Sequence, residues 1–376
     1  MTVPISLAFL KGQPRFMRDR GINTTVITSP GADLDAFAID ENARTVAIPM
    51  SREISLLADI VSLARLIRIL IAIRPSIVQA QTPKAGLLGM IAAWITRRPV
   101  RIYGILGLRY HTTTGRHRTL LMFMERVACR LATSVICVSQ SIREAAIEDR
   151  LAPAEKLVVI AGGSANGIDA VERFNPALVP DDARRSTRAA HGIPDDAVAI
   201  GFIGRIVRDK GIAELATAWT TIRDRHADVH LVLIGPEDAG DPVDAAIMNP
   251  LRSDARVHLV GRIADPVRWY AAVNIVVLPS YREGFPSVPL EAAAMTIPVV
   301  ATNIPGCVDA VRDGVTGILV PVRDAEALAV AIDRYLTDPD LRERHGAAGR
   351  QWVLDDFQQE TVWNALYTEY RRLVDG

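Results

Sequence analysis

The chain has 376 residues, of which 49% are apolar and 23% charged, so it can bury a large core and is long enough for two domains. Its three cysteines form no CxxC pair, which gives no sign of a disulfide framework or a zinc site and favours a reducing cytoplasm. The longest apolar stretch, residues 85–95, is too short to span a bilayer, so we expect a cytoplasmic protein, either soluble or peripheral at the inner face of the cytoplasmic membrane.

The formal net charge of zero conceals two parts of opposite sign. Residues 1–160 contain 21 Lys and Arg against 12 Asp and Glu, and residues 161–376 contain 22 against 31. One explanation of the opposite charges is that both surfaces are simply solvated and their compositions have drifted apart. This explanation is about as good as a functional one. The functional alternative is that the first part faces an anion, such as a phospholipid headgroup layer or a substrate diphosphate.

The first part alternates short apolar runs with helix-period segments, which predicts an α/β layer domain over residues 1–175. Residues 1–5 lead at once into a helical stretch over 6–20, so the first strand is expected to be short or missing. The predicted strands lie near 23–29, 45–50, 77–83, 100–106, 134–139 and 156–163, and the predicted helices near 56–73, 86–95, 119–129 and 141–149.

Residues 176–196 are rich in proline and charge with little apolar periodicity, which predicts a linker with a short helix. Over residues 197–354, six apolar runs that are continuous rather than alternating indicate strands buried on both faces. A second, doubly wound parallel domain is therefore predicted. Its strands lie near 197–203, 229–235, 256–261, 274–280, 297–302 and 317–321, and two helices follow at 340–354 and 359–374.

The stretch GFIGRIVRDKGI, residues 201–212, joins a strand end to a helix start with two cations. Gly204 permits a tight exit from the strand, and Arg205 and Lys210 precede the helix that begins at Gly211. Unpaired N–H groups and positive charge converge there, which indicates a phosphate or diphosphate site, although cations near helix starts are common. The chain has neither GxGxxG after a strand nor GxxxxGK[ST], which argues against a nicotinamide dehydrogenase and a P-loop enzyme.

The stretch SYREGFPSVPLEA, residues 280–292, places two acids eight residues apart beyond a predicted buried strand. Its two prolines fit only at the start of a helix, so a helix is predicted from near Ser287, with Ser287 as the N-cap. Glu283 then lies in the loop and Glu291 at the end of the first turn. Both carboxylates can therefore reach the carboxyl end of the sheet, where ligands bind in open α/β folds.

The N–H groups of Ser287 and Val288 at this helix start form a second candidate anion site. A plain alternative is that Glu283 is a solvated loop acid and Glu291 complements the helix dipole. The same domain, however, offers two cations for a diphosphate and two carboxylates for hydroxyl groups. That combination favours a nucleotide-sugar site.

Together these segments resemble the retaining GT-B glycosyltransferases of family four. Residues 282–292 resemble the E-x7-E motif of that family, and residues 201–212 its diphosphate motif. Residues 166–176 resemble the turn before its linker, and residues 82–94 and 136–148 resemble members that build capsule, O-antigen or exopolysaccharide repeats on polyprenyl-diphosphate carriers. The resemblance covers nearly the whole chain. It implies two Rossmann-like domains facing a central crevice, with residues 355–376 crossing back to the first domain.

The resemblance also implies roles for individual residues. Arg205 and Lys210 would bind the donor diphosphate, Glu283 would hold the transferred sugar, and Glu291 would bind the ribose hydroxyls. We take Glu283, Arg205 and Lys210 as candidate catalytic residues. The candidate donor-binding residues are Gly204, Arg262, Gly284, Phe285, Pro286, Ser287, Val288 and Glu291. The implied reaction retains the anomeric configuration: the departing diphosphate takes the acceptor's proton, and no metal or other cofactor acts beside the UDP-sugar co-substrate.

Three features depart from the family pattern. Gln79, Gln81 and Leu106 stand where members often carry histidines, which reads as a subfamily trait. Thr296 stands where glycine is usual, and it is tolerable there if its backbone avoids positive φ. The third departure is the short or missing first strand.

On the acceptor side the candidates are Lys84, Arg109 and His111, with a plain surface role preferred for His111. The stretch LARLIRILIAIRP, residues 63–75, has arginines among aliphatic residues. A core helix with one solvated stripe is the preferred interpretation, and binding to an anionic membrane surface is the alternative.

The leading functional hypothesis is transfer of a sugar from a UDP-sugar to a polyprenyl-diphosphate-linked or other glycan acceptor in surface polysaccharide biosynthesis. Two alternatives stay open: a nucleotide-sugar epimerase or hydrolase on the same fold, and a homologue that binds the donor but is catalytically impaired. Nucleic acid is not an expected partner.

Overall fold

The computed structural model describes residues 4–50, 55–238, 240–263 and 265–376. The chain divides into two compact units, the first formed by residues 1–167 with 359–376 and the second by residues 168–358. Both are α/β units built on parallel sheets, which confirms the predicted fold class. No helix in the described ranges is long and apolar enough to cross a bilayer.

The first unit opens with the 3-10 helix η1 (Pro4–Leu10), so no strand forms in the described part of the start, and residues 1–3 lie outside it. Six strands follow: β1 (Thr25–Thr28), β2 (Arg44–Ala47), β3 (Ile77–Gln81), β4 (Val100–Ile105), β5 (Ser134–Cys137) and β6 (Leu157–Val159). The helices are α1 (Gln13–Arg18), α2 (Ala32–Glu41), α3 (Leu56–Ile73), α4 (Pro83–Ile95), η2 (Arg109–Thr112), α5 (Gly115–Leu131), α6 (Gln140–Glu148), η3 (Ala154–Lys156) and α15 (Gln359–Asp375).

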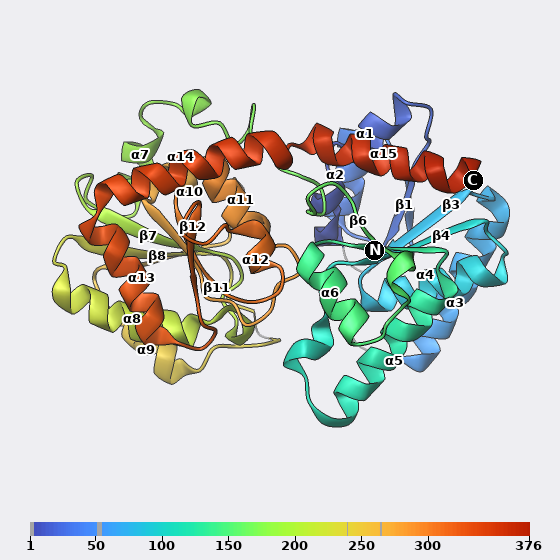
Figure 1. The fold of residues 1–376 in the computed structure, drawn as a ribbon, viewed down its shortest axis with the longest axis horizontal. Coiled ribbons are helices and arrows are strands. Elements are labelled where there is room, and N and C mark those ends of the chain that lie inside the picture. The colour runs from blue at the N-terminus through green and yellow to red at the C-terminus, as the bar shows by residue number, and fades with distance from the viewer. Residues whose placement is uncertain (1–3, 51–54, 239, 264) are drawn as a thin grey trace. The chain divides into compact units, whose positions relative to one another are not determined.

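The main sheet of this unit has the order β3-β4-β5-β6 and is parallel throughout, while β1 and β2 form a separate parallel pair. Helices α3, α4 and α5 lie side by side in one layer (Figure 1). Consecutive residues of β4 point to opposite faces, so Ile102 packs with α15 and α1 while Tyr103 bonds to Glu125 of α5. The sheet is thus covered on both faces.

The second unit has the strands β7 (Val198–Ile203), β8 (Val229–Ile234), β9 (Val257–Gly261), β10 (Ile275–Leu278), β11 (Val299–Thr302) and β12 (Gly317–Val320). Its helices are η4 (Pro176–Leu178), α7 (Ala183–Ala190), η5 (Arg208–Lys210), α8 (Ile212–Arg225), α9 (Ala245–Ser253), α10 (Val267–Ala272), α11 (Ser287–Ala294), α12 (Cys307–Ala310), α13 (Ala325–Thr337) and α14 (Pro339–Asp356). Helix α13 has no counterpart among the predicted elements.

The six strands are parallel in the order β12-β11-β10-β7-β8-β9. This is the classical dinucleotide-binding order, in which the direction of winding reverses between the first and fourth strands, here β7 and β10. Ligands bind at the carboxyl ends of the strands at such a reversal, because the two following loops diverge there. The topology therefore points to the loops after β7 and β10.

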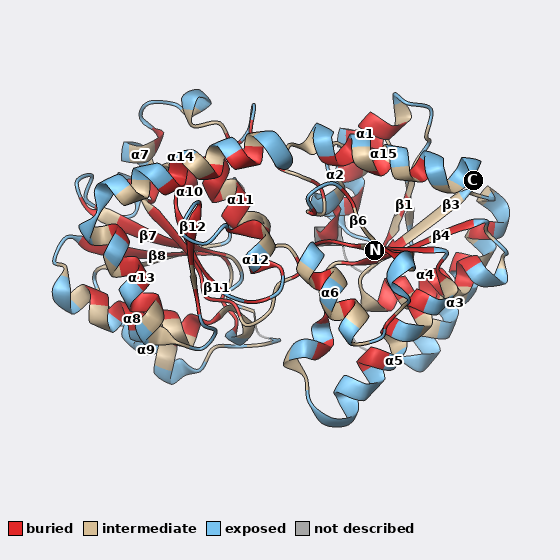
Figure 2. Ribbon diagram, viewed as in Figure 1, coloured by how far each residue is buried: buried red, intermediate tan, exposed pale blue. Residues whose placement is uncertain are grey.

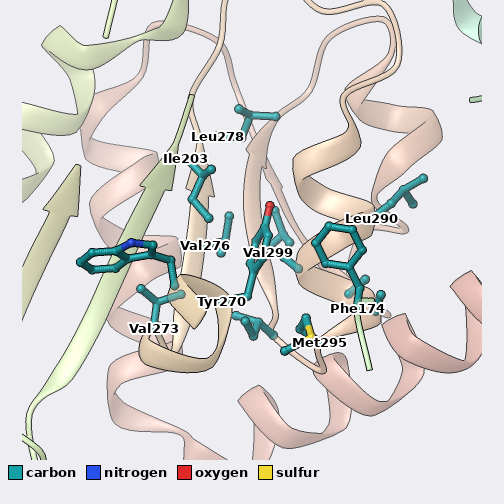
Figure 3. Packing of buried hydrophobic residues seen from close by; sticks show 14 of the residues in the cluster. Phe174, Ile203, Tyr270, Val273, Val276, Leu278, Leu290, Met295 and Val299 are labelled. Atoms are coloured by element: carbon teal, nitrogen blue, oxygen red, sulfur yellow. The ribbon is translucent and has the colours of Figure 1, made fainter. Parts of the chain in front are cut away.

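The core of the second unit lies on both faces of this sheet, whose strands are almost wholly buried apart from the half-buried edge strand β9 (Figure 2). One cluster joins the sheet to α8, α9 and α13, and the other joins it to α10, α11 and α14. Tyr270 of α10 stands in the second cluster beside Phe174, Val276 and Val299 (Figure 3). Burial on both faces explains why the strand sequences are continuously apolar.

The segment 176–196, expected as a linker, belongs instead to the second unit. Arg188 of α7 has no exposed surface and donates hydrogen bonds to the carbonyls of Ala272, Pro194, Asp195 and Ala197 and to Oδ1 of Asn274. The unit boundary accordingly falls at residues 167–168 rather than 175–176, and the returning segment is residues 359–376 rather than 355–376. One buried guanidinium thus ties the segment to the sheet.

Thr296, at the turn between α11 and β11, has a φ of +61°. Threonine was expected to be tolerable here only if the backbone avoids positive φ, and it does not. A β-branched residue in the left-handed region is strained by about 1–2 kcal/mol. Its N–H donates to the carbonyl of Ala293, and a Cβ on Gly346 would lie 2.0 Å from the carbonyl oxygen of Thr296. The close packing of α14 on this turn holds the strained backbone in place.

Candidate functional site

Two loops meet at the winding reversal of the second unit: the β7 loop, residues 204–211, and the β10 loop, residues 279–286. They touch through backbone at Gly211, whose φ is +70° and where a Cβ would lie 2.0 Å from the carbonyl oxygen of Pro279. Only glycine fits both the conformation and the approach. Gly211 therefore serves a close contact between the two loops, in addition to the tight exit from the strand at Gly204.

Asp209 fastens the same two loops together by hydrogen bonds. Its carbonyl accepts from the N–H of Tyr281 at 2.8 Å, and its carboxylate accepts from the guanidinium of Arg282 at 3.2 Å. The loops therefore form one rigid edge rather than two independent segments. Rigid placement of charged groups is what a preorganised binding site requires.

Lys210 and Glu283, which lie 73 residues apart, form a direct ion pair across this edge. The side chain of Lys210 is 22% exposed and that of Glu283 12%, so the pair is largely screened from water yet open at one side. A candidate diphosphate cation and a candidate sugar carboxylate therefore meet at one point. The sequence placed both at the carboxyl edge but gave no sign that they touch.

Arg205 turns toward a third loop, which follows β8. Its guanidinium lies 2.6 Å from the carboxylate of Asp238, and Arg208 pairs in the same way with Asp241 at 2.9 Å. The side chain of Arg205 is half exposed, so this pair is readily broken by a stronger anion. Asp238 and Asp241 were missed because an acidic loop carries no motif.

The helix after the β10 loop begins close to its predicted position. Pro286 is the N-cap of α11 and Ser287 its first residue, so Ser287 is not the N-cap that was expected. Instead its hydroxyl bonds to the carboxylate of Glu291, which also accepts from the hydroxyl of Tyr270 at 2.7 Å. Burial raises the pKa of Glu291, and these two hydrogen bonds offset part of the rise. No pattern in the sequence indicates Tyr270.

The remaining donor-side candidates lie along the same edge. Gly306 packs so closely that a Cβ there would lie 2.5 Å from the carbonyl oxygen of Gly284. The ring of Phe285 packs against that of Phe357, with the ring centroids 5.5 Å apart. Phe285 and Val288 both pack against the core cluster that joins the sheet to α10, α11 and α14. Arg262 follows β9, two strands from β7, with an exposed side chain. The loop around Glu283 is thus fixed by packing on both sides.

The acceptor-side candidates belong to the first unit. Lys84 is buried at the start of α4 and pairs with Asp59 of α3 at 2.6 Å, so it serves the packing of two helices. Arg109 lies exposed on η2. His111, on the same turn, lies 3.2 Å from the carboxylate of Asp149. The structure therefore gives Lys84 an ion-pair partner within the first unit, and its acceptor role stays a prediction.

The three residues that depart from the family's histidines share a small pocket of the first unit, at the carboxyl ends of β3, β4 and β5. Gln79 accepts a hydrogen bond from the hydroxyl of Tyr370, and Leu106 lines the pocket wall. The side-chain oxygen of Gln81 is buried and has no hydrogen-bond partner among the described residues. A buried acceptor without a donor is costly, which makes Gln81 a candidate ligand contact.

The site in the second unit combines an ammonium and a guanidinium with a carboxylate facing the ammonium and a second carboxylate on α11. Positive groups can neutralise a diphosphate, and carboxylates can accept hydrogen bonds from hydroxyl groups. A ligand that carries both a diphosphate and several hydroxyls satisfies all four groups at once.

Two family models match the chain. Residues 15–163 match the glycosyl transferase 4-like domain, and residues 183–352 match the glycosyl transferases group 1 family. Each match falls within one of the two units.

Curated relatives match in the same way. The chain is 36% identical over 374 residues to the capsular polysaccharide biosynthesis glycosyltransferase CapM of Staphylococcus aureus, covering 100% of this chain and 96% of that protein. It is 26% identical over 307 residues to an Escherichia coli UDP-Gal:alpha-D-GlcNAc-diphosphoundecaprenol alpha-1,3-galactosyltransferase, covering 81% of this chain and 77% of the relative.

Solved structures share the fold over nearly the whole length. A glycosyltransferase of Rickettsia africae ESF-5 aligns with a TM-score of 0.81 at 18% identity, covering 98% of this chain and 95% of that one. The Anabaena protein Alr3699/HepE, crystallised with UDP and glucose, aligns with a TM-score of 0.78 at 22% identity and the same coverage. The sheet topology, the two family models and the full-length relative agree: the chain is a glycosyltransferase of GT-B fold and belongs to family four.

Proposed function

We propose that the chain is a retaining glycosyltransferase that moves a sugar from a UDP-sugar to a polyprenyl-diphosphate-linked glycan in surface polysaccharide biosynthesis. The observation that carries the proposal is the ion pair of Lys210 and Glu283 at the winding reversal. In a sugar nucleotide, the bond that breaks joins the anomeric carbon to the diphosphate. A cation for the diphosphate beside a carboxylate for the sugar hydroxyls matches the two sides of that bond.

On this proposal Arg205 and Lys210 exchange their present carboxylate partners for the donor's phosphate oxygens. Negative charge grows on the departing diphosphate as the glycosidic bond breaks, so fixed cations there stabilise the transition state more than the ground state. Glu283, released from Lys210, accepts hydrogen bonds from the sugar hydroxyls. The leaving phosphate oxygen takes the proton of the attacking hydroxyl on the same face, which retains the configuration.

Glu291 is assigned to the ribose hydroxyls. Tyr270 and Ser287 hold its carboxylate in one orientation, which lowers the entropy lost when a diol is bound. Arg262, on the same edge, is assigned to the nucleobase side of the donor.

Three observations support a lipid-linked acceptor. The Escherichia coli relative carries a diphosphoundecaprenol acceptor in its name, and the Staphylococcus aureus relative belongs to capsular polysaccharide biosynthesis. The unpartnered oxygen of Gln81 in the pocket of the first unit would accept a hydrogen bond from an acceptor hydroxyl.

The test is release of UDP from a panel of UDP-sugars, with and without a polyprenyl-diphosphate glycan, for wild type, Glu283→Gln, Lys210→Met and the exposed control Glu326→Gln. We expect release that depends on the acceptor, a loss of at least a hundredfold in kcat/KM for both site variants, and wild-type rates for the control. Product analysis by NMR would show an α-linked sugar from an α-linked donor. An inverted linkage, or full activity of Glu283→Gln, would refute the mechanism.

The same assay separates the alternatives. UDP release without acceptor would identify a hydrolase, interconversion of the sugar an epimerase, and tight donor binding without turnover an impaired homologue. Because the proposal assigns charge stabilisation to Arg205 and Lys210, EDTA should leave the rate unchanged. A rate abolished by EDTA and restored by a divalent cation would contradict that assignment.

A further inference from the structure

A second pair of side chains joins the β10 loop to the segment that begins α8. The hydroxyl of Tyr281, in the β10 loop, donates a hydrogen bond to Oε2 of Glu214 at 2.5 Å. Glu214 is the third residue of α8, the helix that follows the β7 loop, and both residues are half-buried. The two residues are 67 apart in the sequence, so their bond fastens the start of α8 to the loop that carries Glu283.

This bond flanks the Lys210–Glu283 ion pair in both segments. Tyr281 stands two residues before Glu283, and Glu214 stands four residues after Lys210. The backbone of Tyr281 is fixed as well, because its N–H donates to the carbonyl of Asp209 at 2.8 Å. Tyr281 is thus held both at its backbone and at its hydroxyl, and Glu283 follows directly after this anchor.

The ring of Tyr281 is also covered on one face. The guanidinium carbon of Arg323, in the turn after β12, lies 4.9 Å from the centroid of the ring. The ring attracts the cation through its quadrupole, and Arg323 holds a left-handed φ of +61° in this position. Three segments, the β10 loop, the start of α8 and the turn after β12, therefore meet at one tyrosine.

The Tyr281–Glu214 bond and the Lys210–Glu283 pair have different fates in the proposed reaction. A donor that draws Lys210 to its diphosphate separates that lysine from Glu283, so one link between the two loops is lost when Glu283 must hold the sugar. The Tyr281–Glu214 bond takes no part in this exchange and can persist. A carboxylate that acts on the sugar needs such a fixed support, because a small misplacement weakens its contacts in the transition state.

From these contacts we propose that Tyr281 and Glu214 are positioning residues whose hydrogen bond holds Glu283 in place once Lys210 has turned to the donor diphosphate. The inference rests on the proposed function for the roles of Glu283 and Lys210. It adds two residues that act through Glu283 and do not themselves bind the donor.

A simpler interpretation is that Glu214 complements the positive end of the α8 dipole and that Tyr281 only packs. In that case the charge of Glu214 matters and its bond to Tyr281 does not. Glu214→Gln distinguishes the two interpretations, because the amide keeps an acceptor oxygen for the hydroxyl but removes the charge. Glu214→Leu removes both the charge and the acceptor.

The experiment measures the kcat of transfer and, by calorimetry, the affinities for UDP and for the UDP-sugar that the donor panel selects. We expect Tyr281→Phe and Glu214→Leu each to lower kcat about tenfold and to weaken binding of the UDP-sugar about threefold. Their affinity for UDP should stay that of wild type, because UDP has no sugar for Glu283 to hold. Glu214→Gln should keep the kcat of wild type. The double variant of Tyr281→Phe and Glu214→Leu should be no slower than either single variant, because both remove the same bond.

The matched control is Tyr335→Phe, which removes a hydroxyl that lies 2.7 Å from Nδ1 of His345 between α13 and α14. This variant should be less stable than wild type but should keep its kcat and both affinities. Wild-type kcat in Tyr281→Phe, equal losses of affinity for UDP and the UDP-sugar, or additive effects in the double variant would overturn the proposal. A Glu214→Gln variant as slow as Glu214→Leu would assign the effect to the helix dipole instead.

Hydrogen exchange tests the bond without any donor, so its failure is distinguishable from failure of the proposed function. The amides of residues 282–285 should exchange about threefold faster in Tyr281→Phe and Glu214→Leu than in wild type or Tyr335→Phe. Faster exchange in a chain that transfers no sugar would support the anchoring of the loop and refute the proposed function. Unchanged exchange in an active enzyme would overturn the positioning role alone.

Discussion

Glu125 of α5 should make the stability of the first unit fall as pH rises. It is 3% exposed and accepts a hydrogen bond from the hydroxyl of Tyr103 at 2.6 Å. Burial raises the pKa of Glu125 to about 7 from its ordinary value of 4.5. Because the raised pKa belongs to the folded state, the contribution of Glu125 to the free energy of unfolding is fully present below pH 4.5. It is lost as pH rises through about 7. The pKa difference corresponds to about 3 kcal/mol.

Glu125→Gln removes the titration and keeps an oxygen for Tyr103. We expect the variant to gain about 3 kcal/mol relative to wild type between about pH 5 and about pH 8. Since two units need not unfold together, the assay is pulsed hydrogen exchange across a urea series, read on peptides of β4 and α5. The exposed control Glu155→Gln should keep the wild-type dependence. Equal pH slopes in wild type and Glu125→Gln would refute the reasoning.

Three further substitutions test the second unit. Gly211→Ala places a Cβ against the carbonyl of Pro279, so donor binding, measured by calorimetry with UDP, should weaken at least tenfold while the circular dichroism spectrum is unchanged. Arg188→Met leaves several buried acceptors without a donor and should destabilise the unit by about 3–5 kcal/mol in urea unfolding, whereas Arg185→Met should not. Thr296→Gly relieves the left-handed strain and should stabilise it by up to about 1 kcal/mol; a loss of stability would show that the side chain contributes more than the strain costs.

The sequence predicts those elements whose signal is local. Helix α3 begins and ends at the predicted residues, and the continuous apolar runs of the second unit are its six strands, because two-sided burial leaves no polar alternation to obscure them. Helix α13 carries a usable signal that was not taken: Asp324 caps it, and Leu328, Ile332 and Tyr335 are buried at helical spacing.

What the sequence could not supply depends on contacts between distant residues. Arginine is rarely buried, so a polar segment such as α7 is predicted to be a linker. The burial of Arg188 is explained only by its hydrogen bonds to oxygen atoms outside α7, such as the carbonyl of Ala272 and Oδ1 of Asn274. The same holds for the site. Glu283 and Lys210 could each be placed at a strand end, but their pairing depends on the approach of two loops at Gly211. Tyr270 behind Glu291 is likewise a product of packing.

The paired state of the site has a consequence for product release. Arg205 and Lys210 each pair with a carboxylate, so any anion that binds them must replace both partners. An isolated phosphate brings no hydroxyls to occupy Glu283 and leaves that carboxylate without its cation. Under the proposed function, UDP after transfer is in the same position, because its sugar has gone. Formation of the Lys210–Glu283 pair would then compete with bound UDP for Lys210 and speed the release of the product.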